Sequence, residues 1–193
     1  MATKVRPIRP PRPWLQLRIE LAWVEPKVWR VLLVPQTIKL HQLHDVIQYA
    51  MGWTDSHLHE FEIGQRRYGV PDPDWDAPGS VTAEKGVALV SALGRGKTCR
   101  YVYDFGDGWE HKIKIEKVLP ATESAQGAMC VGGENACPPK DVGGPPGYQY
   151  FLEAITDPTH EEHADMLAWC GDGFDPTEFD IEIVNRKLGR LRI

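Results

Sequence analysis

The most informative segment of the chain spans residues 101–111 and reads YVYDFGDGWEH. Its first part alternates aromatic residues with Val102 and Asp104, which is the period of a β-strand. The Gly-Asp-Gly sequence at 106–108 is typical of a turn, because glycine adopts positive φ without steric cost. From residue 109 to residue 116 apolar and charged residues alternate again. We therefore expect a β-hairpin over residues 99–119.

The turn of this hairpin carries more ionisable side chains than a turn needs. Asp104, Asp107, Glu110 and His111 all fall at one end of it. Carboxylates can hold a divalent cation, and water bound to that cation becomes a nucleophile near neutral pH. One hypothesis is therefore a metal-dependent hydrolase that uses Asp104, Asp107 and His111. A structural hypothesis is that the two aspartates cap backbone donors while Trp109 anchors a neighbouring loop.

Composition limits the class of protein. The chain has 193 residues, of which 42% are hydrophobic and 25% charged, as in ordinary globular proteins. A net charge of −5 excludes a globally basic nucleic-acid footprint. No apolar run approaches the ~20 residues that span a bilayer, and the N-terminus lacks the apolar region of a secretory signal. Four cysteines are too few for a disulfide scaffold, so we expect a cytoplasmic protein without a membrane partner.

The segments that precede the hairpin predict a sheet with one long helix. Residues 1–13 form a basic, proline-rich arm, and 14–193 are expected to form a single domain. Alternating residues at 15–23 and an apolar run at 28–34 predict two antiparallel strands. Thr37 is a suitable N-cap for a helix that ends at Gly52. A third strand is expected in the second half of residues 53–63, and residues 87–93 fit a strand or a helix.

The segments that follow the hairpin are of two kinds. Residues 120–147 are rich in glycine and proline and are too long for an ordinary connection, which is typical of functional loops. Helical spacing then predicts three short helices at about 148–155, 160–169 and 180–188. The predicted fold class is α+β, with a mixed, mainly antiparallel sheet, one long helix after the first hairpin and a C-terminal group of short helices.

Metal-ligand patterns in the sequence are incomplete. Cys130 and Cys137 are spaced more widely than in a zinc knuckle and are two in number. His111 is a third candidate ligand. His41 and His44 share a helix face, which is also common without any metal. We therefore assign no cofactor, and a divalent metal stays an alternative.

Several blocks, which fall in order along nearly the whole chain, resemble the plasmid pRiA4b ORF-3-like family. They are 26–30 (PKVWR), 43–44 (LH), 50–53 (AMGW), 57–61 (HLHEF), 103–111 (YDFGDGWEH), 136–144 (ACPPKDVGG), 147–148 (GY), 174–180 (FDPTEFD) and 184–185 (VN). The resemblance implies a compact α+β domain associated with plasmids or mobile elements, and it supplies no activity. The family usually carries an acidic residue after Cys-Pro-Pro, where this chain has Lys140.

The sequence favours a binding module over an enzyme. Its site is expected where the tip of the 101–119 hairpin meets the 130–148 loop, because glycines there permit close backbone approach. The candidate binding residues are Trp29, Arg30, Trp109, Asp141, Gly143, Gly144 and Tyr148. A protein, a peptide and a nucleic acid all stay open as partners, and the oligomeric state is undetermined.

Overall fold

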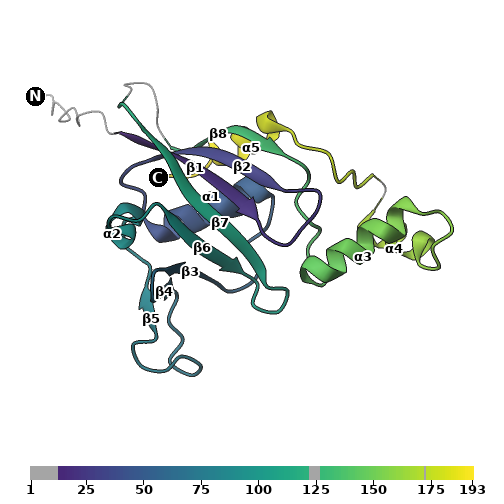
Figure 1. Cartoon of the computed structure of the whole chain (residues 1–193), viewed down its shortest axis with the longest axis horizontal. Helices are drawn as coiled ribbons and strands as arrows, with labels where there is room; N and C mark the ends of the chain where they lie inside the picture. The colour runs from purple at the N-terminus through teal and green to yellow at the C-terminus, as the bar shows by residue number, and fades with distance from the viewer. Residues whose placement is uncertain (1–12, 122–126, 172) are drawn as a thin grey trace, which may run out of the picture.

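The computed structural model describes residues 13–121, 127–171 and 173–193. An eight-stranded sheet with the order β5-β4-β3-β6-β7-β1-β2-β8 forms its centre (Figure 1). Neighbouring strands are antiparallel, apart from the parallel pair β4 and β5. The strands are β1 Trp14–Leu21, β2 Trp29–Pro35, β3 His59–Ile63, β4 Arg66–Gly69, β5 Val81–Ala83, β6 Thr98–Tyr103, β7 Trp109–Leu119 and β8 Met129–Glu134.

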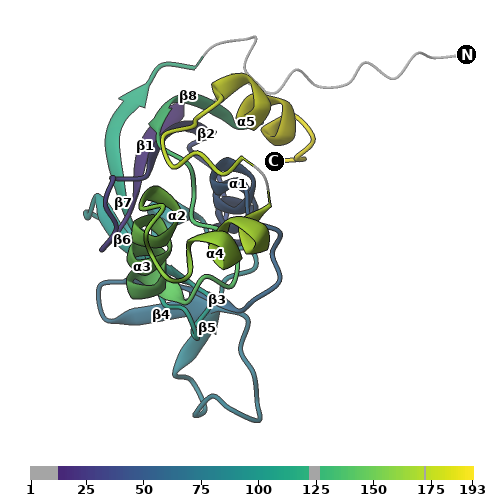
Figure 2. The same cartoon turned by 90° about the vertical axis from the view of Figure 1, so that its right-hand side faces the viewer.

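One face of this sheet is apolar and the other is polar. Leu15, Leu17 and Ile19 of β1 are buried, whereas Gln16 and Arg18 between them are partly exposed. The same alternation runs along β7. This pattern is what a sheet needs when helices cover one side of it and water covers the other. In the side view of Figure 2, α1 lies against one face, with α5 beside it.

Five helices complete the described structure: α1 Leu40–Met51, α2 Leu89–Leu93, α3 Gly144–Thr156, α4 His163–Cys170 and α5 Ile181–Leu188. Helix α1 buries Leu43, Val46 and Ile47 against the sheet and ends at Gly52, whose φ is 94°. Helix α5 begins at Asp180, whose carboxylate accepts hydrogen bonds from two backbone amides of the first turn. None of the described helices has the length and apolar character needed to cross a membrane.

The α+β class and the hairpin are confirmed, and several local predictions need correction. The N-cap of α1 is Lys39, not Thr37. The stretch 120–147 is not a continuous loop, because it contains β8 and the start of α3. The pattern also gave no sign of β4 and β5, which have four and three residues. Residues 1–12 of the predicted arm lie outside the described residues, and the single-domain boundary stays a prediction.

Candidate functional site

A cavity of about 730 Å³ opens between α1, the start of β3 and the chain that leads into β5. Ionisable side chains dominate its lining. Among the described residues, six carboxylates, four histidines and one arginine line it: Asp45, Asp55, Glu60, Asp72, Asp76, Glu84, His41, His44, His57, His59 and Arg67. Four exposed apolar side chains also line it, namely Leu58, Val70, Trp75 and Phe105, and Gly69 and Val81 complete the lining. The cavity is therefore lined by carboxylates and histidines together with exposed apolar side chains.

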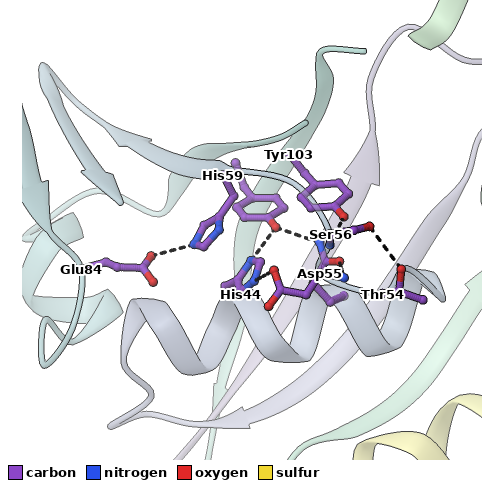
Figure 3. Close-up of polar contacts among 9 residues, drawn as sticks. His44, Thr54, Asp55, Ser56, His59, Glu84 and Tyr103 are labelled. Carbon is purple, nitrogen blue, oxygen red and sulfur yellow. Dashed lines mark hydrogen bonds and ion pairs between the residues drawn. The ribbon is translucent and has the colours of Figure 1, made fainter. Parts of the chain in front are cut away.

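A closed ring of hydrogen bonds includes two of the lining residues, His44 and Asp55. Gln48 donates to the Tyr101 hydroxyl (3.1 Å), and that hydroxyl lies 2.7 Å from Nδ1 of His44. Nε2 of His44 lies 2.9 Å from Asp55, and the Asp55 backbone amide donates back to the Gln48 side chain. A carboxylate accepts only, so Nε2 of His44 carries the proton and Nδ1 accepts from Tyr101. Figure 3 shows His44 reaching from α1 toward Asp55.

The His44 ring also stacks on His59. The ring centroids are 3.5 Å apart and the planes differ by 8°. Nε2 of His59 lies 3.2 Å from Glu84, on the other side of the stack (Figure 3). Burial, and then the neighbouring His59, lower the pKa of His44 to about 4. His44 is therefore neutral at pH 7 and acts as a hydrogen-bonding group of the cavity lining.

A second group gathers at the hairpin tip, where His57 faces two aspartates. Nε2 of His57 lies 3.4 Å from Oδ2 of Asp104 and 3.4 Å from Oδ1 of Asp141. The pairing of β3 with β6 explains the first contact, because His59 lies opposite Tyr103 and the Asp104 amide donates to the Leu58 carbonyl. The chain entering β3 therefore runs beside the turn.

Packing of the hairpin tip against α3 explains the second contact. Gly144 starts α3, and a side chain at this position would collide with the Asp107 carbonyl. The bare backbone of Gly144 thus lies directly on the tip, which brings the preceding Asp141 next to Asp104. The hairpin tip and the 130–148 segment do meet, and the close backbone approach that glycine permits is used within the protein.

Aspartates in both groups have strained backbones. Asp55, Asp104 and Asp141 adopt φ values of 51°, 57° and 60°, in the left-handed region that disfavours residues with a Cβ. Such conformations persist where the surroundings dictate them, and they gather at functional sites. All three carboxylates belong to one of the two histidine groups.

The predicted hydrolytic trio is not assembled. Among the described residues, Asp104, Asp107 and His111 do not together form a group whose ligand atoms lie within 4.8 Å of one another. His111 is fully buried on the apolar face, with Nδ1 near the carbonyls of Tyr101 (3.3 Å) and Trp109 (3.1 Å). Asp104 Oδ1 accepts from the amides of Gly106 and Asp107, which is the capping role of the structural hypothesis.

The predicted cysteine ligands also stand apart. Cys130 lies in β8, where its backbone exchanges two hydrogen bonds with the Asn185 side chain. Burial raises the pKa of Cys137 to about 12, so its sulfur is a thiol at neutral pH. Neither cysteine falls in a three-ligand group with His111 among the described residues.

Arg30, one of the predicted binding residues, has a structural environment. Its guanidinium is buried and donates to the carbonyls of Trp29, Ala50, Glu134 and Asn135. It also lies over the Phe179 ring, 4.3 Å from the centroid. The side chain thus joins β2, α1 and the end of β8. Burial lowers its pKa from the ordinary value.

The other predicted binding residues divide into buried and surface positions. Trp109 and Tyr148 are buried in the core, and Trp109 packs near Trp53. Trp29 is half-buried under Arg18 and donates to Glu134 (2.9 Å). Gly143 is the N-cap of α3, next to Gly144. Of the predicted set, Asp141 is the residue whose side chain joins a histidine group.

Sequence reasoning missed His57, His59, Asp55 and Glu84 as site residues. Asp55, His57 and His59 lie in one segment and Glu84 lies in another, and together they match no metal-ligand or catalytic motif. The available signal was the block HLHEF, because His57 and His59 are two apart and so share one side of an extended chain. The helical spacing pairs His44 with His41, whereas in the structure His44 contacts Asp55 and His59.

The comparisons with known proteins show the family of the chain and add no activity. The chain is 46% identical, over 180 residues, to the uncharacterized protein y4hQ of Sinorhizobium fredii (strain NBRC 101917 / NGR234), covering 92% of this chain and 91% of that protein. It is similar to a crystal structure of a protein of unknown function, MM3350 from Methanosarcina mazei Go1. The TM-score is 0.81 at 35% identity, covering 90% of this chain and 98% of the other. The model of the plasmid pRiA4b ORF-3-like proteins matches residues 13–183. The chain therefore belongs to the plasmid pRiA4b ORF-3-like family.

Proposed function

We propose that this protein is a binding module for a basic peptide segment, and that the acidic cavity receives an arginine or lysine side chain of that segment. One observation carries the proposal. Six carboxylates and one arginine line the same cavity among the described residues. Charged residues are costly to gather in a partly enclosed space unless an opposite charge offsets them.

The internal partners leave this cavity with excess negative charge. Arg67 is paired with Glu60 through two nitrogens, at 2.7 and 2.6 Å, so Glu60 already neutralises its positive charge. Asp45 has a raised pKa because burial and the nearby carboxylates of Asp55 and Glu84 disfavour its ionised form. A guanidinium or ammonium group in the cavity would lower the pKa of Asp45 again and favour its ionised form.

The exposed aromatic residues of the lining suit the apolar stem of such a side chain. Trp75 is 89% exposed and Phe105 is 51% exposed, and both line the cavity. Aromatic faces attract cations, and long basic side chains cover apolar surface while their charged heads reach polar groups. Exposed aromatic residues at a concave site are also typical anchors of protein recognition.

The association with plasmids or mobile elements belongs to the same proposal, and rests on the plasmid reading frame that the family is named after. The alternative of a hydrolase built on Asp104, Asp107 and His111 has no geometric support, because these three residues do not converge.

Calorimetric titration of the full chain with an arginine-rich peptide tests the proposal. We expect saturable binding that weakens with added salt, and an acidic peptide of equal length should not bind. Asp45→Asn and Trp75→Ala should each weaken binding about fivefold or more, since each removes a group that faces the ligand. Asp74→Asn is the matched control, because Asp74 is exposed beside Trp75 and does not line the cavity. Equal affinity in Asp45→Asn, Trp75→Ala and Asp74→Asn would refute the proposal.

A further inference from the structure

His57, Asp104 and Asp141 form a donor set that the acidic cavity does not explain. Asp104 and Asp141 are not lining residues of the cavity, whereas His57 is one of them. The three residues come from three segments: the chain before β3, the hairpin turn and the chain before α3. Their side chains are 30%, 13% and 61% exposed, so the group lies at the surface with its centre shielded.

In each carboxylate one oxygen has a partner elsewhere in the protein and the other oxygen faces His57. Oδ1 of Asp104 accepts from the amide of Gly106 at 3.0 Å, which leaves Oδ2 facing the histidine. Oδ2 of Asp141 lies 3.5 Å from the Lys140 ammonium, which leaves Oδ1 facing the same nitrogen. Carboxylates whose second oxygen has a partner elsewhere have the arrangement of oriented metal ligands.

The histidine nitrogen between them is not satisfied by hydrogen bonding. Nε2 of His57 is shielded from solvent and has no hydrogen-bond partner, although two carboxylate oxygens lie 3.4 Å away. The ring is oriented by an edge contact with Tyr103, with centroids 5.8 Å apart and planes at 77°. The nitrogen therefore points between the two oxygens.

These distances match the spacing of ligands around a metal ion. Nitrogen and oxygen ligands lie about 2.1 Å from a zinc ion, so two of them at a tetrahedral angle are about 3.4 Å apart. Both nitrogen–oxygen distances in the group are 3.4 Å. All three ligand atoms lie within 4.8 Å of one another. An ion at the centre would need little movement of the side chains.

The other histidine group is less suited to a metal ion, because its nitrogens already have hydrogen-bond partners. His44, Asp55 and His59 also bring ligand atoms within 4.8 Å. Both nitrogens of His44 are already used in the ring with Tyr101 and Asp55, and Nε2 of His59 is used by Glu84. Binding an ion there would break several buried hydrogen bonds, which is unfavourable.

We propose that His57, Asp104 and Asp141 bind one divalent transition-metal ion of the Zn²⁺ or Mn²⁺ type. Imidazole with carboxylate ligands suits these ions, and three protein ligands leave a coordination position open. The proposal does not depend on the occupant of the acidic cavity, because two of the three ligands lie outside the cavity lining.

Zinc titration of the untagged, chelator-treated full chain tests this site. Calorimetry should show one Zn²⁺ bound per chain, and Asp104→Asn and His57→Gln should each weaken binding at least tenfold. Asparagine keeps an oxygen for the Gly106 amide, so Asp104→Asn preserves the turn. Asp55→Asn is the matched control from the other histidine group and should bind Zn²⁺ like the unaltered chain. Far-ultraviolet circular dichroism of each variant establishes that it is folded.

Cobalt substitution then identifies the ligands directly. Co²⁺ in the site should give visible absorption bands that are lost in His57→Gln, without a thiolate-to-cobalt charge-transfer band. Such a band would place the ion on a cysteine and overturn the assignment. Absence of Zn²⁺ binding, equal binding by Asp104→Asn, or weaker binding in Asp55→Asn alone would also overturn it. Peptide binding can succeed or fail independently, since it is measured with different variants.

Discussion

His111 is a buried histidine that the fold keeps neutral. Burial lowers its pKa to about 4, although two backbone carbonyls near Nδ1 act in the opposite direction. His44 also has a pKa lowered to about 4. A histidine whose pKa is lower in the folded state stabilises the fold above its unfolded pKa of 6.5, and that contribution is lost as the pH falls toward 4.

Acidification below about pH 6.5 should therefore lower the unfolding free energy of this protein. Between pH 7 and pH 5, His111 should cost the fold about 2 kcal/mol of unfolding free energy. In His111→Asn, whose amide replaces the Nδ1 donor and does not titrate, this part of the pH dependence should disappear. Urea unfolding at both pH values measures it. The same pH dependence in the variant and the unaltered chain would contradict a neutral, buried His111.

At the residue scale, the alternating pattern of residues 109–115 already argues against the predicted trio of Asp104, Asp107 and His111. Trp109, His111, Ile113 and Ile115 alternate with charged residues, which already puts His111 on the apolar face. Grouping it with Asp104 relied on closeness along the chain. His57 and Asp141 could not be found that way, because 47 and 37 positions separate them from Asp104, and pairing between distant segments joins them.

At the scale of elements, the contact between the hairpin tip and α3 depends on a single glycine. Gly144 has φ of 69°, and its missing Cβ leaves room for the Asp107 carbonyl. Gly143 has φ of 90°, yet a Cβ there would meet nothing closer than the Gly147 Cα at 3.6 Å. The two neighbours therefore share backbone strain and differ in packing.

Alanine substitutions at these two glycines should separate strain from packing. Gly143→Ala should lower the unfolding free energy by about 1–2 kcal/mol, the cost of a left-handed backbone conformation. Gly144→Ala should cost at least about 1.5 kcal/mol more, because the hairpin tip must move to admit the methyl group. Denaturant unfolding of both variants gives the difference. Equal losses would mean that the tip does not rest on α3.

Elements with strong periodicity were predicted and those without it were not. The 99–119 hairpin and the helix ending at Gly52 have long, regular patterns, and both are present. Strand β8 reads MCVGGE, and its two glycines suggest a loop when seen alone. Gly133 is nevertheless required in the sheet, since a side chain there would collide with Phe179 and Arg30. That requirement comes from tertiary packing and leaves no local signal.

At the scale of the whole molecule, the net charge of −5 is unevenly distributed. Carboxylates are concentrated in one cavity, while those on the polar face of the sheet are paired, as in the contacts of Arg100 with Glu62 and Glu110. A fold selected for stability alone would not gather six carboxylates around a single arginine, because their repulsion opposes folding. Residues kept for binding are often destabilising in the absence of the ligand.

Asp45→Asn should therefore stabilise the ligand-free protein while it weakens peptide binding. The folded-state pKa of Asp45 is raised, so its carboxylate contributes stability below the unfolded pKa and loses that contribution as the pH rises through the folded value. At pH 7 the variant should gain about 0.5 kcal/mol, reduced by solvent screening, or about 1–2 °C in Tm. At pH 4 the gain should shrink toward zero. Thermal unfolding of both proteins at the two pH values measures this change. If Asp45→Asn is instead less stable at pH 7, Asp45 has a favourable partner in the ligand-free fold. A bound cation would then offset no repulsion at Asp45, which would contradict the proposed binding of a basic side chain.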